Sequence, residues 1–295
     1  MKKLIVLTDF SKTARNAANI ALEIAINVHL DVQLVNSYLT PFAIFAAEGE
    51  GRTPFDVSLI AVASENGLKK EVKRLCKIMD SKPRGAQKTV VETISTLEPL
   101  PDIIGRLTKS NEVKLVVAGV HESTLPFIFS GMDAHQLLKG LNCPLLIVPK
   151  TFRHLVVNNL MFASNAGRSD LEIIDKLYSC SRNHNVHFCV CHVSKPVFVA
   201  DFNEEDRILK FGHELSKIGR GGICLNELQG ANLVKSLNRF VAARDIDMIA
   251  IAYYSHSFGW ELFHENHVSK LIKNQRLPML IFPANSWQTY HGQIG

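Results

Sequence analysis

Two stretches of the chain repeat the same order of short apolar runs and amphipathic segments. The run at residues 3–9 is repeated at residues 159–165, and each copy leads into a segment with the periodicity of a helix. The run at residues 143–149, Cys-Pro-Leu-Leu-Ile-Val-Pro, is repeated at residues 277–283 as Leu-Pro-Met-Leu-Ile-Phe-Pro. A fixed order of repeated runs is stronger evidence than any one predicted strand. The sequence therefore predicts two copies of one folding unit, the second shorter in its middle.

The first copy alternates strands with helices. Short apolar runs that end in polar residues are typical of buried parallel strands. Asp9 and Ser11 offer an N-cap to the first helix. The five predicted strands lie at residues 3–8, 32–36, 89–94, 114–119 and 144–148, and the helices at residues 11–27, 57–79, 100–110 and 133–141. This alternation predicts right-handed crossovers and a parallel sheet that is covered on both faces.

The second copy repeats this order after a short linker at residues 150–154. Its predicted strands lie at residues 159–165, 187–193, 223–228, 248–252 and 278–282, and its helices at residues 170–180, 204–218, 231–244 and 262–274. We therefore expect a first domain at residues 1–150, a second domain at residues 155–285 and a C-terminal tail at residues 286–295. A linker this short is expected to hold the two domains against each other.

Composition excludes several classes of protein. Hydrophobic residues make up 46% of the chain and charged residues 21%, as in globular proteins. The net charge of +5 comes without a Lys/Arg block, so no nucleic-acid partner is expected. Neither a signal peptide nor an apolar run of roughly 18 residues is found, which predicts a cytoplasmic protein without a membrane partner. The six cysteines have no framework spacing and are expected to stay thiols in a reducing compartment.

Several residues resemble the universal stress protein family. Asp9 follows the first strand, Gly119 ends the fourth, and Gly131 begins the fourth helix twelve residues before the closing Cys-Pro run at residues 143–149. In the second copy, His192 at the end of the second strand also fits the family pattern. The resemblance implies two tandem doubly wound five-stranded domains of the Rossmann-like, adenine nucleotide α-hydrolase-like kind. It also implies a role in stress response.

Many members of this family bind ATP through a fourth-strand signature of Gly, two residues, Gly, nine residues, then Gly and Ser or Thr. Such glycines let backbone approach phosphate, and amides at a helix start attract anions. The first copy retains Gly119 and Gly131, but His121 or Glu122 stands at the second Gly position and Met132 at the hydroxyl position. A carboxylate at Glu122 would repel a triphosphate, and a thioether cannot donate to one.

The resemblance implies places for a nucleotide in the first copy. Asp9 would lie near ribose or metal, Ser37 and Ala118 near the base, and Gly119 with Gly131 around the phosphates. The candidate ligand-binding residues are Thr8, Asp9, Ser37, Ala118, Gly119, His121, Gly131, Met132 and Asp133. In the second copy, Tyr253 replaces the first Gly, Asn165 replaces Asp9, and residues 265–266 replace Gly131 and Met132. Its site is expected to be lost.

Two other side-chain patterns have competing interpretations. His187, Cys189 and Cys191 alternate along a strand and share one face, so they are zinc-ligand candidates, as are the histidines at 264 and 267, or else buried structural side chains. Asp9 with His121 forms an acid–base pair in one interpretation, whereas helix capping explains Asp9 in the other. No credible nucleophile is found, and the protein is predicted not to be an enzyme.

Two apolar loops complete the prediction. Residues 41–47 form either a lid or partner-binding patch or a short packed helix, and residues 125–129 place bulky side chains in the signature loop.

We expect ligand sensing or protein interaction in stress response, without dedicated catalysis. The alternatives are an ATP switch with weak hydrolysis in the first domain, and a small-molecule or metal-binding scaffold in the second. Expected partners are the other domain across the apolar fifth-strand edge, a second copy in a homodimer, and an unidentified protein.

Overall fold

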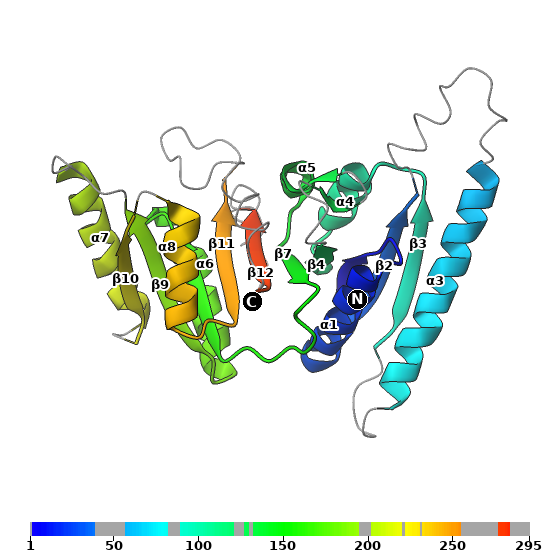
Figure 1. The fold of residues 1–295 in the computed structure, drawn as a ribbon, viewed down its shortest axis with the longest axis horizontal. Coiled ribbons are helices and arrows are strands. Elements are labelled where there is room, and N and C mark those ends of the chain that lie inside the picture. Colours follow the sequence, from blue (N-terminus) through cyan, green and yellow to red (C-terminus); the bar gives the residue numbers. More distant parts are fainter. Residues whose placement is uncertain are drawn as a thin grey trace, which may run out of the picture. The chain divides into compact units, whose positions relative to one another are not determined.

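The chain divides into two compact units in a computed structural model (Figure 1). Unit 1 comprises Met1–Leu155, and unit 2 begins at Val156. The structure describes residues 2–38, 57–81, 89–120, 127–129, 132–194, 202–219, 222–230, 232–254 and 277–283. Each unit is a twisted sheet of five strands with helices on its faces.

Unit 1 has the strand order β7-β4-β1-β2-β3, and every neighbouring pair is parallel. The strands are β1 (Lys3–Leu7), β2 (Asp31–Ser37), β3 (Val91–Thr96), β4 (Val113–Val120) and β7 (Leu145–Pro149). Residues on both faces of β1, β4 and β7 are buried, as expected for a sheet covered on both sides. The order changes direction at β1, which has β2 on one side and β4 on the other.

Among the described residues of unit 1, four helices cover this sheet: α1 (Lys12–Val28), α3 (Val57–Asp80), α4 (Leu100–Thr108) and α5 (Ala134–Gly140). The helices α1 and α3 contact each other, and α3 lies along β3 and β2 (Figure 1). The helices α4 and α5 also contact each other. Because right-handed crossovers run from β1 to β2 to β3 and then back to β4, these two pairs cover opposite faces.

A short hairpin stands where the sequence predicted only loop and the start of a helix. Phe127–Phe129 (β5) pairs antiparallel with Met132–Asp133 (β6), and α5 begins at Ala134. Aromatic and β-branched residues favour strands, which explains β5. Met132 and Asp133 therefore belong to a strand that directly precedes α5, and the helix begins one residue after its predicted start at about residue 133.

Unit 2 repeats the architecture with the strand order β10-β9-β8-β11-β12, again parallel throughout. Its elements are β8 (Asn159–Ser164), α6 (Arg168–Asn183), β9 (His187–Ser194), α7 (Phe202–Gly219), β10 (Cys224–Gln229), α8 (Leu233–Ala243), β11 (Met248–Tyr253) and β12 (Met279–Pro283). The helices α6 and α7 contact each other, whereas α8 lies against β9 and β10 (Figure 1). Helix α8 returns the chain toward β11 and so covers the opposite face.

The predicted fold class is confirmed: both units are α/β with a parallel sheet. The third strand lies two residues later than predicted: it covers Val91–Thr96 and not residues 89–94. Residues 95–96, which were predicted to be loop, pair with β2. Predictions for residues 40–56, the loop at 121–126, the helix at 262–274 and the tail at 286–295 lie outside the described residues. Within the described part of the chain, no helix is both long and apolar enough to span a membrane.

Candidate functional site

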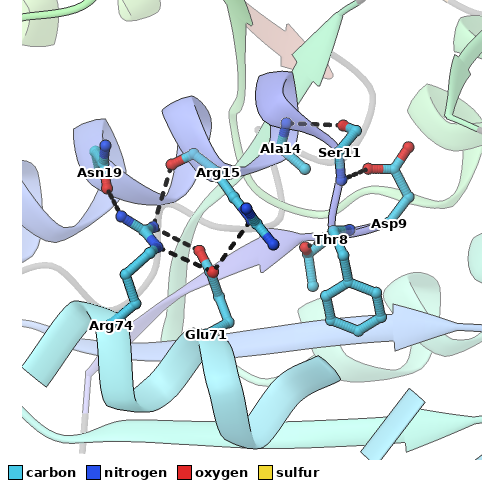
Figure 2. Close-up of polar contacts among 9 residues, drawn as sticks. Thr8, Asp9, Ser11, Ala14, Arg15, Asn19, Glu71 and Arg74 are labelled. Atoms are coloured by element: carbon cyan, nitrogen blue, oxygen red, sulfur yellow. Dashed lines mark hydrogen bonds and ion pairs between the residues drawn. The ribbon is translucent and has the colours of Figure 1, made fainter. Parts of the chain in front are cut away.

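The turn that follows β1 is closed by its own side chains (Figure 2). The Thr8 hydroxyl accepts a hydrogen bond from the Phe10 amide at 3.1 Å, and Asp9 Oδ1 accepts one from the Ser11 amide at 2.9 Å. Ser11 is the N-cap of α1, and its hydroxyl accepts from the Ala14 amide at 3.1 Å. The predicted capping role of Ser11 is thus confirmed. Asp9 instead closes the turn that precedes the helix.

Phe10 adopts a left-handed backbone conformation with φ of 63°, which a bulky residue rarely does. Its ring compensates by packing against α3 at Gly67, where a Cβ would lie only 2.6 Å from the ring. The absence of a side chain at Gly67 is therefore what accommodates the ring. The turn that carries Asp9 is fixed from two sides, by hydrogen bonds and by this contact.

Buried polar side chains join the carboxyl ends of β1, β2 and β3. Asn36 donates to the Thr8 carbonyl at 2.6 Å, and its own oxygen accepts from the Ser64 hydroxyl of α3 at 2.6 Å. The hydroxyl oxygens of Ser64 and Ser95 are 2.6 Å apart. The Ser37 hydroxyl donates to the Glu98 carbonyl at 2.8 Å, so its proton is used within the protein.

Close packing explains why residue 119 is a glycine. A Cβ at this position would lie 2.7 Å from the Thr13 carbonyl oxygen and 3.0 Å from the Thr13 Cγ2. Gly119 therefore lets β4 approach the first turn of α1. Ala118 is fully buried next to it. The family-based role of Gly119 at a phosphate is not needed to explain why this residue is glycine.

An ion cluster joins α1 to α3 beside this turn (Figure 2). The Glu71 side chain is 4% exposed and binds Arg74 at 2.5 Å and Arg15 at 3.8 Å. Arg74 also donates to Asn19 at 2.6 Å. Because Glu71 is buried, removing either guanidinium leaves a less compensated charge. The cluster sets the spacing of the two helices that position the turn.

Five of the predicted site residues come together at the carboxyl end of the unit 1 sheet. They are Thr8 and Asp9 after β1, Ser37 at the end of β2, and Ala118 and Gly119 near the end of β4. His121 and Gly131 lie outside the described residues, as does any pairing of Asp9 with His121. Met132 and Asp133 lie in β6.

Unit 2 builds the same turn from different residues. The Ser164 hydroxyl accepts from the Ala166 amide at 2.9 Å, and Asn165 Oδ1 accepts from the Gly167 amide at 2.7 Å. Ala166 has φ of 57°, matching Phe10. The turn thus has the same hydrogen bonds and backbone form, and the acidic residue Asp9 is replaced by a neutral amide at Asn165.

A buried carboxylate stands next to this second turn. Asp170, in the first turn of α6, is 1% exposed and occupies the place of Ala14 in unit 1. It accepts hydrogen bonds from the Ser164 hydroxyl at 2.6 Å, from the Asn165 amide at 3.0 Å and from the Tyr254 hydroxyl. Burial raises the pKa of Asp170 to about 6, although the three hydrogen bonds oppose the shift. Burial and the Asp170 charge raise the pKa of Tyr254.

His192 takes the place in unit 2 that Asn36 takes in unit 1. It is fully buried, and its Nδ1 lies 2.9 Å from the Ser164 carbonyl oxygen. A carbonyl only accepts, so Nδ1 carries the proton in this contact. In both units a buried side chain of the second strand thus donates to a backbone carbonyl at the carboxyl end of the first strand.

Strand register corrects one assignment made from the sequence. Ile5 pairs with Val116 in unit 1, and the matching residue Met161 pairs with Ile249 in unit 2. Three residues further on, Ala252 stands where Gly119 does, so the prediction that Tyr253 replaces Gly119 is wrong by one residue. Tyr254 consequently falls at the position of His121. The apolar run of β11 contains no glycine that could have fixed this register.

The Asp170 cluster was missed because an acidic residue at a helix start is commonly exposed and favourable there. Comparison of the two copies could have revealed the cluster. Ala14 is a small residue on the inner face of a helix, and a carboxylate, Asp170, replaces it in the second copy. For the zinc-ligand candidates, His187 is exposed and Cys191 is buried. The described residues contain no group of three or more metal-ligating side chains.

Each unit is a doubly wound parallel α/β sheet with a polar turn at the carboxyl end of its first strand, which defines a Rossmann-like protein. The sequence profile of the Universal stress protein family matches residues 1–149. The chain therefore belongs to the universal stress protein family, as its sequence resemblance implied.

Solved structures extend the likeness over both units. A universal stress protein from Archaeoglobus fulgidus is 12% identical, with a TM-score of 0.65 and 95% of each chain covered. A putative universal stress protein from Pseudomonas aeruginosa is 13% identical, with a TM-score of 0.60 and 98% of each chain covered. At these identities the likeness shows the fold. No curated protein matches the sequence.

Proposed function

We propose that this protein acts in the cytoplasmic stress response by sensing a ligand at the carboxyl end of the unit 1 sheet, without dedicated catalysis. One observation carries the proposal: two turns of the same shape differ by one charge. Asp9 and Asn165 each accept one backbone hydrogen bond at the same place in the turn. The turn does not need the charge of Asp9, which is therefore available for a ligand.

The place and chemistry of Asp9 suit a nucleotide. In open parallel sheets, ligands bind beyond the carboxyl ends of the strands where the strand order reverses, and β1 is that strand in unit 1. A carboxylate with one oxygen to spare accepts hydrogen bonds from ribose hydroxyls or coordinates Mg²⁺ through oxygen. Magnesium ATP is the first ligand to test, because the family resemblance implies it.

The equivalent place in unit 2 is filled by its own side chains. Tyr254 directly follows β11 and donates its hydroxyl to the buried Asp170. Asp170 in turn accepts from Ser164 and the Asn165 amide. A ligand there would have to displace hydrogen bonds to a buried carboxylate, which is costly. Binding is therefore expected in unit 1 only.

The polar groups of the unit 1 site favour binding over catalysis. The Thr8 hydroxyl accepts from the turn, and the Ser37 hydroxyl donates to a backbone carbonyl. Burial raises the pKa of the Cys143 thiol to about 12, so this thiol is a poor nucleophile.

Calorimetric titration of the full chain with ATP and Mg²⁺ tests the proposal, using Asp9→Asn as the variant. We expect the wild-type protein to bind and the variant to bind at least about tenfold more weakly, since a lost charge-assisted contact costs roughly 1.5–3 kcal/mol. The variant should keep its thermal midpoint, because Asn165 closes the same turn in unit 2. Asp175→Asn on the exposed side of α6 is the control, with the same change in net charge.

Two results would contradict the proposal. Equal affinity of the wild-type protein and Asp9→Asn would remove Asp9 from the site. Absence of binding in the wild-type protein, with no thermal shift at millimolar ATP, would exclude ATP sensing and favour protein interaction as the function.

A further inference from the structure

Two cysteines of unit 2 lie next to each other on neighbouring strands. The parallel register of β9 and β10 pairs Cys189 directly with Cys224. Neighbouring strands are about 4.8 Å apart, inside the range of about 4.4–6.8 Å that separates the Cα atoms of disulfide-bonded cysteines. Among the described strands of unit 2, β10 is an outer strand and pairs only with β9.

The Cys189 side chain points to the face of the sheet that α8 covers. The preceding residue, Phe188, has its ring centroid 6.1 Å from that of Tyr178 in α6. Successive residues of a strand point to opposite faces, so Cys189 points away from α6. The Arg244 guanidinium at the end of α8 is close enough to lower the pKa of Cys189, although burial dominates and raises it to about 11.

The Cys224 side chain points to the same face. The next residue, Leu225, lies on the α7 side, where its Cδ2 would be 3.6 Å from a Cβ placed on Gly212. Cys224 therefore faces away from α7, as Cys189 faces away from α6. Interaction of the two thiols also appears in the pKa of Cys189, which Cys224 raises.

Exposure and register select this pair from the six cysteines of the chain. Cys224 is exposed and Cys189 is half-buried, so a small oxidant in solution reaches the pair. Cys191 is on the same face as Cys189, but it is buried and its register partner is Asn226. Cys180 is exposed on α6, the helix that Cys189 points away from.

We propose that Cys189 and Cys224 are an oxidation site that forms a reversible disulfide when the protein meets a peroxide. Hydrogen peroxide oxidises the Cys224 thiol to a sulfenic acid and is itself reduced to water. Because the raised pKa of Cys189 keeps its thiol protonated at rest, proton loss accompanies the next step. The Cys189 sulfur attacks the Cys224 sulfur, and the hydroxyl group leaves with that proton as a second water. Two electrons leave the thiol pair and two reduce the peroxide.

The exposure of the pair makes this disulfide easy to reduce. Cys224 is exposed on the outer strand β10, so a reductant in solution reaches the bond. Exposed disulfides are among the labile, regulatory ones. Thiol reductants of the cytoplasm would restore the pair, which is compatible with free thiols at rest.

The test uses the full chain, reduced and then treated with hydrogen peroxide. Tryptic mapping without reductant should find residues 183–207 joined to residues 221–235, because trypsin does not cleave between Lys195 and Pro196. The chain should run as a monomer on a non-reducing denaturing gel, and dithiothreitol should separate the two peptides. Cys189→Ser and Cys224→Ser should abolish the joined peptide. Cys191→Ser, with a thiol removed from the same strand, and Cys180→Ser, with an exposed thiol removed elsewhere, should retain it.

Three results would overturn the proposal: a joined peptide that depends on Cys191, a disulfide only between two molecules, or Cys224 oxidised to the sulfonic acid with no disulfide. Alkylation of the wild-type protein before and after peroxide gives an independent reading that needs no variant. Protection of Cys189 and Cys224 together is the expected result, and protection of neither contradicts it. The outcome does not depend on the unit 1 ligand, because none of these residues lies in that site.

Discussion

Asp170 gives unit 2 a pH dependence of a specific sign. Its pKa is about 6 in the folded protein against 3.8 for an ordinary Asp, so between these values the folded state binds more protons than the unfolded state. The stability that Asp170 contributes is complete below about pH 4 and is lost as the pH rises through about 6. At neutral pH the ionised carboxylate is held in place by Ser164, Tyr254 and the turn amide.

Replacing Asp170 by Asn should remove this dependence. Relative to the wild-type protein, the free energy of unfolding of the variant should increase from about pH 4 to about pH 7 by up to about 3 kcal/mol, at about 1.36 kcal/mol for each pKa unit. Urea denaturation at both pH values measures the difference. Asp175→Asn, exposed on the same helix, controls for loss of a helix carboxylate. Parallel pH profiles for wild type and Asp170→Asn would contradict the assignment.

At the scale of elements, close packing of β4 on α1 depends on Gly119. Gly119→Ala would place a methyl group 2.7 Å from the Thr13 carbonyl oxygen, and strand and helix would have to separate. We expect the free energy of unfolding to fall by about 1–3 kcal/mol, the usual cost of overpacking. Gly212→Ala in α7 is the matched control: its nearest neighbour is Leu225 at 3.6 Å, so it should be neutral or gain up to about 1 kcal/mol of helix propensity. Equal effects of the two changes in thermal or urea unfolding would refute the packing argument.

The elements that could be predicted from the sequence are those with a clear local pattern of apolar and polar residues. Apolar runs such as β1 and β7 sit between polar residues, and Ser11 marks the start of α1. The β5–β6 hairpin is too short to give a periodic pattern, so it was predicted as loop. The buried polar contacts of Asn36 and Asp170 depend on partners 28 and 84 residues away in the chain, which no local pattern reports.

At the scale of the whole molecule, the two units are expected to respond to different signals. Magnesium ATP should slow amide hydrogen exchange in β1 and the first turn of α1, because a bound ligand stabilises only the state that binds it. Peroxide should slow exchange in β9 and β10, where the disulfide would join the strands. Mass spectrometry of exchange under each condition measures both. Equal protection of the two units by ATP would contradict the prediction that ATP binds in unit 1 only.

The matching turns after β1 and β8 show how two copies of one folding unit can carry different chemistry. Aspartate and asparagine have nearly the same shape, and each closes its turn with the same backbone hydrogen bond. A mutation between them changes the charge of one unit while leaving its fold intact. Two copies of one folding unit can therefore differ in the chemistry of this turn while the turn keeps its shape.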